Sequence, residues 1–504
     1  MLINQNVTVQ VYIHLEGTNT LKTTSVLSAA LQKDNLANLT IDNAASNSTG
    51  NTGSLTAAAA ANSANGAGIG GGANGNGNGS NITISGGSVI AYSNGFGSGI
   101  GGGAEGNGSG ITISGGLVKA YSNGFGSGIG GGCEGNGSDI TISGGSVTAY
   151  SHDDGSGIGG GSRGNDSRGN GSYITISGGS VKAYSEGYGS GIGGGDKGNG
   201  SYIAISDGSV TAYSTQHGSG IGGGYNGNGS YIAISDGSVT AYSECNGSGI
   251  GGGYKGNGSN ITISGGSVAA HSKWFGSGIG GGREGNGSNI TISGGSVTAY
   301  SERNGSGIGG GYNGSGSDIT ISGGSVTAYS HGFDNVKGSD IGGGYNGNSN
   351  NIYISGGSVK AQTLDYTPVK SANENISVYR YDISNPDRSN IGIDGNNWTP
   401  SIHSDNDKTL YAWLTGEDHY ITVGSEKKAY IFDSASETFS NTKRTLSSSD
   451  FQFAAPENLT YNNCVKSATV EVKNGIKGVE NITVKYFLGD TLVLYPVSNN
   501  TLQY

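Results

Sequence analysis

Ionisable side chains gather most densely at Asp153, Asp154, Arg163, Asp166 and Arg168. Clustered carboxylates can hold calcium, and a basic residue beside them can take a proton from a sugar, which is the chemistry of polysaccharide elimination. Most of this group lies within an insertion, however, because the string SRGN occurs twice there in close succession. Inserted loops are usually solvated, so we expect a solvated loop here and no catalytic residue.

Two further carboxylates, Asp207 and Asp236, occupy the same place in successive copies of a repeated unit. If the copies stack as strands, these carboxylates lie ~4.8 Å apart, where they either share a cation or remain a solvated pair. The seven histidines are scattered over different phases of the repeat, and no HExxH motif or zinc-type Cys/His spacing is present. We therefore expect a protein that is not an enzyme and that needs no cofactor, with calcium at this aspartate pair as the one exception left open.

The most regular chemistry-bearing feature is a tyrosine that recurs at one position of the unit. That position reads Tyr92, Tyr121, Tyr150, Tyr184, Tyr213, Tyr242, His271, Tyr300, Tyr329 and Gln362. Stacked units would align these side chains into a row, which we call the tyrosine ladder. The ladder either stabilises neighbouring units by aromatic stacking or offers sugars a surface with an apolar ring and a polar tip. Its eight tyrosines are the candidate ligand-binding residues.

The element that must position these residues is a repeat of 29 residues, marked by the isoleucine of GIGGG or, in the last copy, DIGGG. This isoleucine falls at Ile69, Ile100, Ile129, Ile158, Ile192, Ile221, Ile250, Ile279, Ile308 and Ile341. Within a unit, GIGGG, ITIS and SVTAYS are strand-like, whereas GNGS, the Gly-Gly of SGGS and a variable stretch such as NGFGS are turn-like. Three short strands per unit predict one coil of a right-handed, three-sided parallel β-helix, an all-β solenoid.

Alternation within the strands predicts which side chains face the axis. The two isoleucines of ITI share a face, and so do the valine and alanine of SVTAY. The position between that valine and alanine varies from Ile90 through Lys119 to Lys360, so it should face water. Each coil is therefore expected to bury three isoleucines, one valine and one alanine.

The ends of the chain depart from the repeat. Residues 1–66 are strand-rich but lack GIGGG, and we expect them to be capping turns of a β-helix that occupies 67–363. Residues 364–447 predict a small β domain with ISVYRYDI, TLYAWL, YITVG and KAYIFD as strands. Residues 448–504 have the strand spacing of an immunoglobulin-like module with too few strands to close a sandwich.

Composition excludes several function classes. The chain has 504 residues, 103 of them glycine, and a formal net charge of −11, so no basic face for nucleic acid is expected. No run of about 18 or more apolar residues predicts a membrane span. The start, MLINQNVTVQVYIHLEG, does not resemble a signal peptide. Cys133, Cys245 and Cys464 are too few for a disulfide framework.

The repeat GIGGG…GNGSNITISGGSVTAYS resembles the Gly-rich parallel β-helix repeats of large surface proteins from gut Firmicutes, some of which are grouped with carbohydrate-binding β-helix domains. The segment HLEGTNTL resembles the first coils of those proteins. The segment YNNCVKSATVEVKNGIKGVENITVKYF resembles bacterial Ig-like modules that occur in tandem on such chains. The resemblance implies an extracellular or cell-surface location, with the missing signal peptide and anchor outside this sequence.

These observations predict a non-enzymatic surface or secreted protein, either an adhesin that binds polysaccharide or host glycan or a rod that spaces other modules. One alternative is a β-helix polysaccharide lyase or hydrolase. A second alternative is an ice-binding solenoid, because Thr83, Thr112 and Thr141 continue into Thr175 as a row. Alanines at 204 and 233 interrupt that row, and ice binders usually carry paired threonine rows.

Overall fold

The structure is a computed structural model, and the residues that it describes fall into two sets of ranges. The first set is 1–3, 6–33, 37–43, 52–60, 65–73, 77–163, 168–332, 337–354 and 358–361. The second set is 378–384, 391–394, 396–398, 409–415, 418–424, 426–433, 438–440, 451–454, 469–472, 486–488 and 491–493. The chain divides into two compact units, Met1–Asn375 and Ile376–Tyr504. Within these described ranges, no helix is long and apolar enough to cross a membrane.

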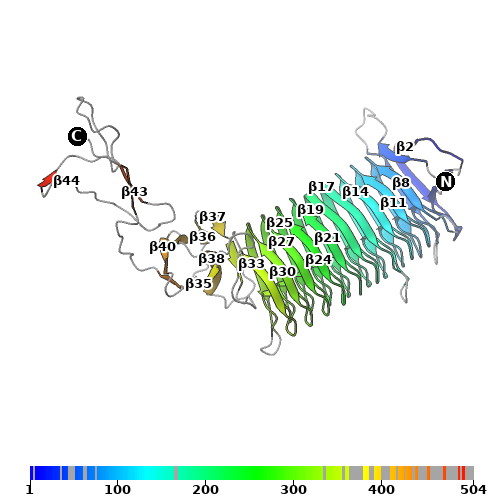
Figure 1. Ribbon diagram of the computed structural model, residues 1–504. Helices are drawn as coiled ribbons and strands as arrows, with labels where there is room; N and C mark the ends of the chain where they lie inside the picture. The colour runs from blue at the N-terminus through cyan, green and yellow to red at the C-terminus, as the bar shows by residue number, and fades with distance from the viewer. Residues whose placement is uncertain are drawn as a thin grey trace, which may run out of the picture. The chain divides into compact units, whose positions relative to one another are not determined.

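The first unit is a parallel β-solenoid whose turns each contribute three strands, as the repeat predicts (Figure 1). The shortest strands, at GIGGG, pair in a 12-stranded parallel sheet, the first ladder. Its strands are β1 (Leu2–Ile3), β4 (Leu31–Lys33), β7 (Ile69–Gly70), β10 (Ile100–Gly101), β13 (Ile129–Gly130), β16 (Ile158–Gly159), β18 (Ile192–Gly193), β20 (Ile221–Gly222), β23 (Ile250–Gly251), β26 (Ile279–Gly280), β29 (Ile308–Gly309) and β32 (Ile341–Gly342).

The other two strands of each turn form the second and third ladders. The second ladder, at ITI, has β2 (Val11–Leu15), β5 (Leu39–Asn43), β8 (Gly79–Ile84), β11 (Gly108–Ile113), β14 (Gly137–Ile142), β21 (Gly229–Ile234), β24 (Gly258–Ile263), β27 (Gly287–Ile292), β30 (Gly316–Ile321) and β33 (Ser349–Ile354). The third ladder, at SVTAYS, has β3 (Thr18–Lys22), β6 (Ser54–Ala58), β9 (Ser88–Ser93), β12 (Leu117–Ser122), β15 (Ser146–Ser151), β22 (Ser238–Ser243), β25 (Ser267–Ser272), β28 (Ser296–Ser301), β31 (Ser325–Ser330) and β34 (Ser358–Lys360). Two longer strands, β17 (Gly171–Ser185) and β19 (Gly200–Ser214), run through both ladders.

Within the three ladders, the strand residues of one repeat pair with their equivalents in the next turn apart from a register shift between β17 and β19, so like side chains mostly stack on like. Ile221 pairs with Ile250 in the first ladder, and Ile232 pairs with Ile261 in the second. Both isoleucines of ITI, the isoleucine of GIGGG, and the valine and alanine of SVTAY are buried in the repeats, as the alternation predicts. This set of small aliphatic side chains is the core of the rod, and each turn buries its share only against the turns above and below.

Serine hydroxyls complete the interior. Ser219 Oγ donates to the carbonyl of Gly223 within the same turn at 2.9 Å. Ser243 Oγ donates to the carbonyl of Gly218 in the preceding turn at 2.8 Å. Both serines are fully buried, and the same two bonds recur along the rod. A buried hydroxyl costs free energy unless it is hydrogen-bonded, so these bonds make serine compatible with the core.

The position between the valine and alanine of the third ladder faces outward over most of the rod but not at its last described turns. Thr240 is exposed, whereas Thr327 is 5% exposed and Lys360 is 7% exposed. Thr327 pairs in register with Lys360, whose long side chain therefore lies beside it. The prediction that this position faces water is thus wrong for Thr327 and Lys360.

The second unit contains antiparallel strands. They are β35 (Val378–Ser384), β36 (Ile391–Ile393), β37 (Asn396–Trp398), β38 (Thr409–Thr415), β39 (His419–Val423), β40 (Glu426–Asp433), β41 (Thr438–Ser440), β42 (Phe451–Ala454), β43 (Thr469–Val472), β44 (Tyr486–Leu488) and β45 (Thr491–Val493). Strands β35, β38, β39 and β40 coincide with the four segments expected to be strands between 364 and 447. Leu414, Ile421 and Tyr430 form a small buried cluster there.

Candidate functional site

The tyrosine ladder lies on the outer side of the strands that form the third ladder. In each strand, the tyrosine stands between two inward-facing residues. In β22, Ala241 and Ser243 are buried, whereas Tyr242 between them is partly exposed. Tyr213 pairs in register with Tyr242, and the same register holds from Tyr92 to Tyr329. All eight tyrosines are therefore in one row, half-buried, as the alternation predicts. Gln362 lies outside the described residues.

The rings of the ladder stack on one another in some turns and tilt in others. Ring centroids are 5.0 Å apart with an interplanar angle of 3° for Tyr213 and Tyr242, and 5.4 Å apart with 4° for Tyr300 and Tyr329. The angle opens to 55° between Tyr184 and Tyr213, whose centroids are 6.1 Å apart. Rings that lie face to face cover each other's faces. A ligand on the ladder therefore meets ring edges and hydroxyls over the stacked pairs, and open ring faces only at the tilted ones.

Carboxylates of the neighbouring turns accept from the ladder hydroxyls. Glu186 hydrogen-bonds to Tyr150, and Glu244 hydrogen-bonds to Tyr213. Burial and these carboxylates raise the pKa of both phenols well above 10. Burial, followed by the charges of Glu302 and Glu244, raises the pKa of Tyr242 to about 12. These hydroxyls therefore stay protonated near neutral pH, and Tyr150 and Tyr213 use their single O–H donor on the glutamates.

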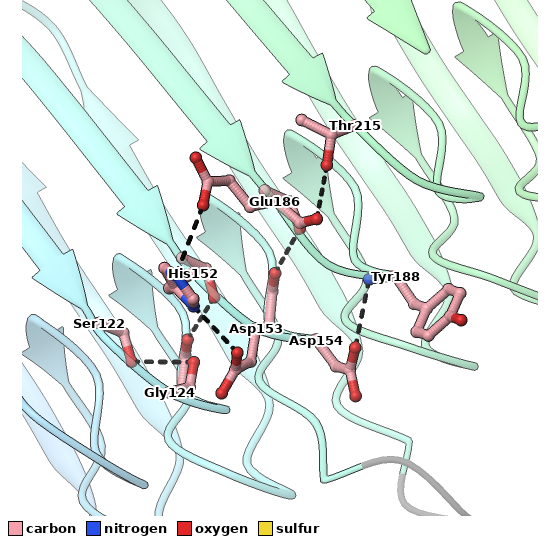
Figure 2. Close-up of polar contacts among 12 residues, drawn as sticks. Ser122, Gly124, His152, Asp153, Asp154, Glu186, Tyr188 and Thr215 are labelled. Carbon is pink, nitrogen blue, oxygen red and sulfur yellow. Dashed lines mark hydrogen bonds and ion pairs between the residues drawn. The ribbon is translucent and has the colours of Figure 1, made fainter. Parts of the chain in front are cut away.

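The acidic group around Asp153 is spread over the outside of the rod (Figure 2). His152 Nδ1 lies 3.0 Å from Asp153 Oδ1, and His152 Nε2 lies 3.7 Å from Glu186 Oε2. Arg163 pairs with Glu134 at 3.8 Å. His152 is well exposed, so its contacts are solvent-screened. Asp166 lies outside the described residues, and Arg168 is exposed.

Asp154 points toward Tyr188 (Figure 2). A carboxylate that the sequence analysis did not single out, Asp196, lies near it. Asp154 Oδ1 accepts from the backbone N–H of Tyr188 at 3.3 Å, and its own carbonyl accepts from the N–H of Asp196 at 2.9 Å. Asp196 is 4% exposed, and its Oδ1 has no hydrogen-bond partner in the part of the chain that the structure describes. Burial and the nearby charge of Asp154 raise the pKa of Asp196 to about 6.

Asp207 and Asp236 each accept a hydrogen bond from the backbone of their own turn. Asp207 Oδ1 accepts from the N–H of Gly208 at 2.6 Å, and Asp236 Oδ1 accepts from the N–H of Gly237 at 2.7 Å. Both aspartates are exposed. Over the described ranges, no group of three or more His, Cys, Asp or Glu residues is placed to hold a metal ion. The aspartate pair thus has a local role in turn geometry, and calcium there stays a prediction.

Sequence reasoning missed a second aromatic row just before ITI. Tyr173, Tyr202 and Tyr231 stack with ring centroids 4.8 Å apart and interplanar angles of 4° and 3°. Their φ angles are 53° to 54°, in the left-handed region that other turns fill with Asn, Asp or Gly. Bulky residues are uncommon there. The Asn, Asp and Gly that other turns carry at this position were the signal that could have marked these tyrosines as unusual.

A third aromatic row occupies the corner where the variable turn meets the residue after GGG. Tyr225 and Tyr254 stack with centroids 5.3 Å apart. Arg283 takes the next place, and its guanidinium carbon lies 5.0 to 5.7 Å from the ring centroids of Tyr254, Phe275 and Tyr312. Cation–π attraction of this kind stabilises the corner.

The threonine row of the ice-binding alternative runs in register along the second ladder. Thr83, Thr112 and Thr141 pair in sequence with Thr175, which pairs in turn with Ala204. Ala233 follows Ala204 in the same row. The structure thus aligns one threonine row and shows where the two alanines break it.

Stacked strands in register, aliphatic side chains along the axis and no helix in the described ranges define the class as a parallel β-solenoid. Nine segments match a family model described as Beta helix repeat, at residues 82–104, 111–133, 140–162, 174–196, 203–225, 232–254, 261–283, 290–312 and 319–345. The chain is a beta-helix repeat protein. No curated protein and no solved structure matches it.

Proposed function

We propose that this chain is a non-enzymatic cell-surface or secreted repeat protein whose solenoid binds polysaccharide along the tyrosine ladder. The observation that carries the proposal is the register of the ladder, in which eight half-buried tyrosines repeat once per turn on a rigid support. Such a row suits a repeating polymer, because many weak contacts add by avidity.

The open ring surfaces and the rim carboxylates of the ladder support the same proposal. Tilted pairs such as Tyr184 and Tyr213 leave ring surface open between turns. A sugar presents hydroxyls and apolar ring faces, so it can use both kinds of contact. Glu186 and Glu244 add acceptors at the rim of the ladder.

The test is the triple variant Tyr184→Ser, Tyr213→Ser and Tyr242→Ser in the full chain. The proposal expects loss of binding to soluble polysaccharides with the β-rich circular dichroism spectrum retained. If binding survives in a folded triple variant, the ladder is the wrong surface. If the rod melts instead, the ladder stabilises the fold, and the outward hydroxyls must be probed singly with Tyr→Phe variants.

The alternative of a polysaccharide lyase or hydrolase depends on the group in Figure 2, because His152 lies between the carboxylates of Asp153 and Glu186. An imidazole placed between carboxylates can move protons. Product release from an acidic polysaccharide that disappears in His152→Ala would favour this alternative over the binding protein.

A further inference from the structure

We infer that a second glycan site lies in a shallow groove on the second ladder, beside the Tyr173–Tyr202–Tyr231 stack, and that it takes an uncharged linear polysaccharide. The groove has a volume of about 540 Å³. It is lined by Asn228, Ser230, Tyr231, Asn257, Ser259, Asn260, Asn286, Ser288, Ser315, Ser317 and Asn350. The inference depends on the proposed class of ligand but not on the tyrosine ladder.

The chemistry of the lining points to a neutral, hydroxyl-rich ligand. Every lining residue is Asn, Ser or Tyr, and none carries a charge near neutral pH. Nothing in this set would attract an ionic polymer, whereas amide and hydroxyl groups both donate to and accept from sugar hydroxyls.

The asparagine row supplies donors in register. Asn228 Oδ1 accepts from the N–H of Asn257, and Asn257 Oδ1 accepts from the N–H of Asn286, both at 2.8 Å. Asn286 Oδ1 accepts in turn from the N–H of Ser315 at 2.8 Å. These bonds occupy the side-chain oxygens and fix the amide planes. Among the described residues, the Nδ2 groups of the three asparagines have no protein partner, so one exposed amide donor remains per turn.

A parallel serine row borders the asparagines. Ser230 pairs with Ser259, and Ser288 pairs with Ser317, in the same ladder. No hydrogen bond from the Oγ atoms of these four partly exposed serines occurs within the described ranges. The groove thus repeats one amide and one hydroxyl every ~4.8 Å, a spacing close to one sugar ring.

Tyr231 closes one end of the groove with an aromatic wall. One face of its ring is covered by Tyr202, and the residue at the same place in the next turn is Asn260, which leaves the other face turned toward the groove. Tyr231 is 50% exposed at the end of the stack. A tyrosine held at φ 53°, where Asn fits without strain, is a backbone outlier beside a polar groove, and such outliers cluster at ligand sites.

The experiment compares two ends of the same stack. Tyr231→Asn removes the wall, and Tyr173→Asn removes the equivalent tyrosine at the opposite end, which does not line the groove. Both changes install the residue that other turns carry at this left-handed position, so both should fold. A third variant, Ser259→Ala with Ser288→Ala, removes two hydroxyls from the floor. Binding is measured by affinity electrophoresis of the full chain in gels that contain soluble neutral glucans, mannans or xylans, with polygalacturonate as the acidic comparison.

We expect Tyr231→Asn to weaken binding to at least one neutral polymer by about three- to tenfold, with Tyr173→Asn unchanged. The double serine variant should weaken the same polymer. Equal affinities for the two tyrosine variants, or stronger binding to polygalacturonate, would overturn the groove site. If only the ladder triple variant loses binding, the groove inference fails and the proposed function stands. If the wild type binds none of the polymers, both fail.

Discussion

Gly222 and Gly251 pair in successive turns of the first ladder, and a β-carbon built on Gly222 would lie 2.0 Å from the carbonyl oxygen of Gly251. The φ of Gly222 is +131°, which L side chains rarely adopt. Glycine is therefore required there for two separate reasons: backbone conformation and the close approach of the next turn.

Gly222→Ala should accordingly destabilise the rod by about 3 kcal/mol or more, from backbone strain and overpacking together. The matched control is Gly17→Ala, because Gly17 has a φ of +62° but no atom lies within 4 Å of the position that its β-carbon would take. We expect only about 1–2 kcal/mol there. Urea denaturation followed by circular dichroism measures both, and equal midpoints would contradict the close stacking at Gly222.

Ile232→Asn should cost more stability than Thr240→Asn. Ile232 is fully buried and has only aliphatic neighbours in register, whereas Thr240 is exposed. The buried amide loses apolar burial of about 1.5–3 kcal/mol and adds about 1–3 kcal/mol for its unpaired polar atoms. Thr240→Asn should stay within about 0.5 kcal/mol of the wild type. Identical denaturation midpoints would reject the in-and-out assignment.

Cys133 and Cys245 should remain unlinked and differ in reactivity. Both are free thiols, about four turns or ~19 Å apart along the axis, far beyond the reach of a disulfide. Burial raises the pKa of Cys133 to about 12, and burial also raises the pKa of the more accessible Cys245. Maleimide labelling followed by mass spectrometry should modify Cys245 before Cys133. An intramolecular link between them, or faster labelling of Cys133, would contradict the stacking.

Asp196 should make the free energy of unfolding fall as the pH rises from about 4 to about 6. The folded-state pKa is about 6, against an ordinary value of 3.8, so in this window the folded protein holds a proton that the unfolded chain releases. Above this window the penalty is fully present, on the order of 1–3 kcal/mol. Asp196→Asn should flatten the pH profile of urea denaturation between these limits. Parallel profiles for variant and wild type would show that Asp196 is solvated.

Most of the fold could be predicted from the sequence because the same pattern of strands and turns recurs in each repeat. The alternation in ITI and SVTAY correctly places Ile232 inside and Thr240 outside. The tyrosine ladder also follows, because identical residues at one period must stack once turns are in register. The failures at Thr327 and Lys360 occur where the repeat ends and neighbours no longer have identical surroundings.

The candidate sites depend on contacts between turns that a single repeat does not contain. Glu186 meets Tyr150 from the following turn, and Asp196 is buried beside Asp154 although tyrosine or arginine fills its position in later turns. The groove beside Tyr231 arises because the aromatic stack stops at that turn and asparagine follows. Such features arise from differences between the copies of the repeat, so the pattern that the copies share does not predict them.

The most direct measurement of the central claim is a glycan array probed with the full chain, performed beside an assay for polysaccharide cleavage on the same polymers. We predict binding to one or more polysaccharides without release of shorter products. Cleavage of a bound polymer would make the protein an enzyme, and the absence of binding to any polysaccharide on the array would contradict the account.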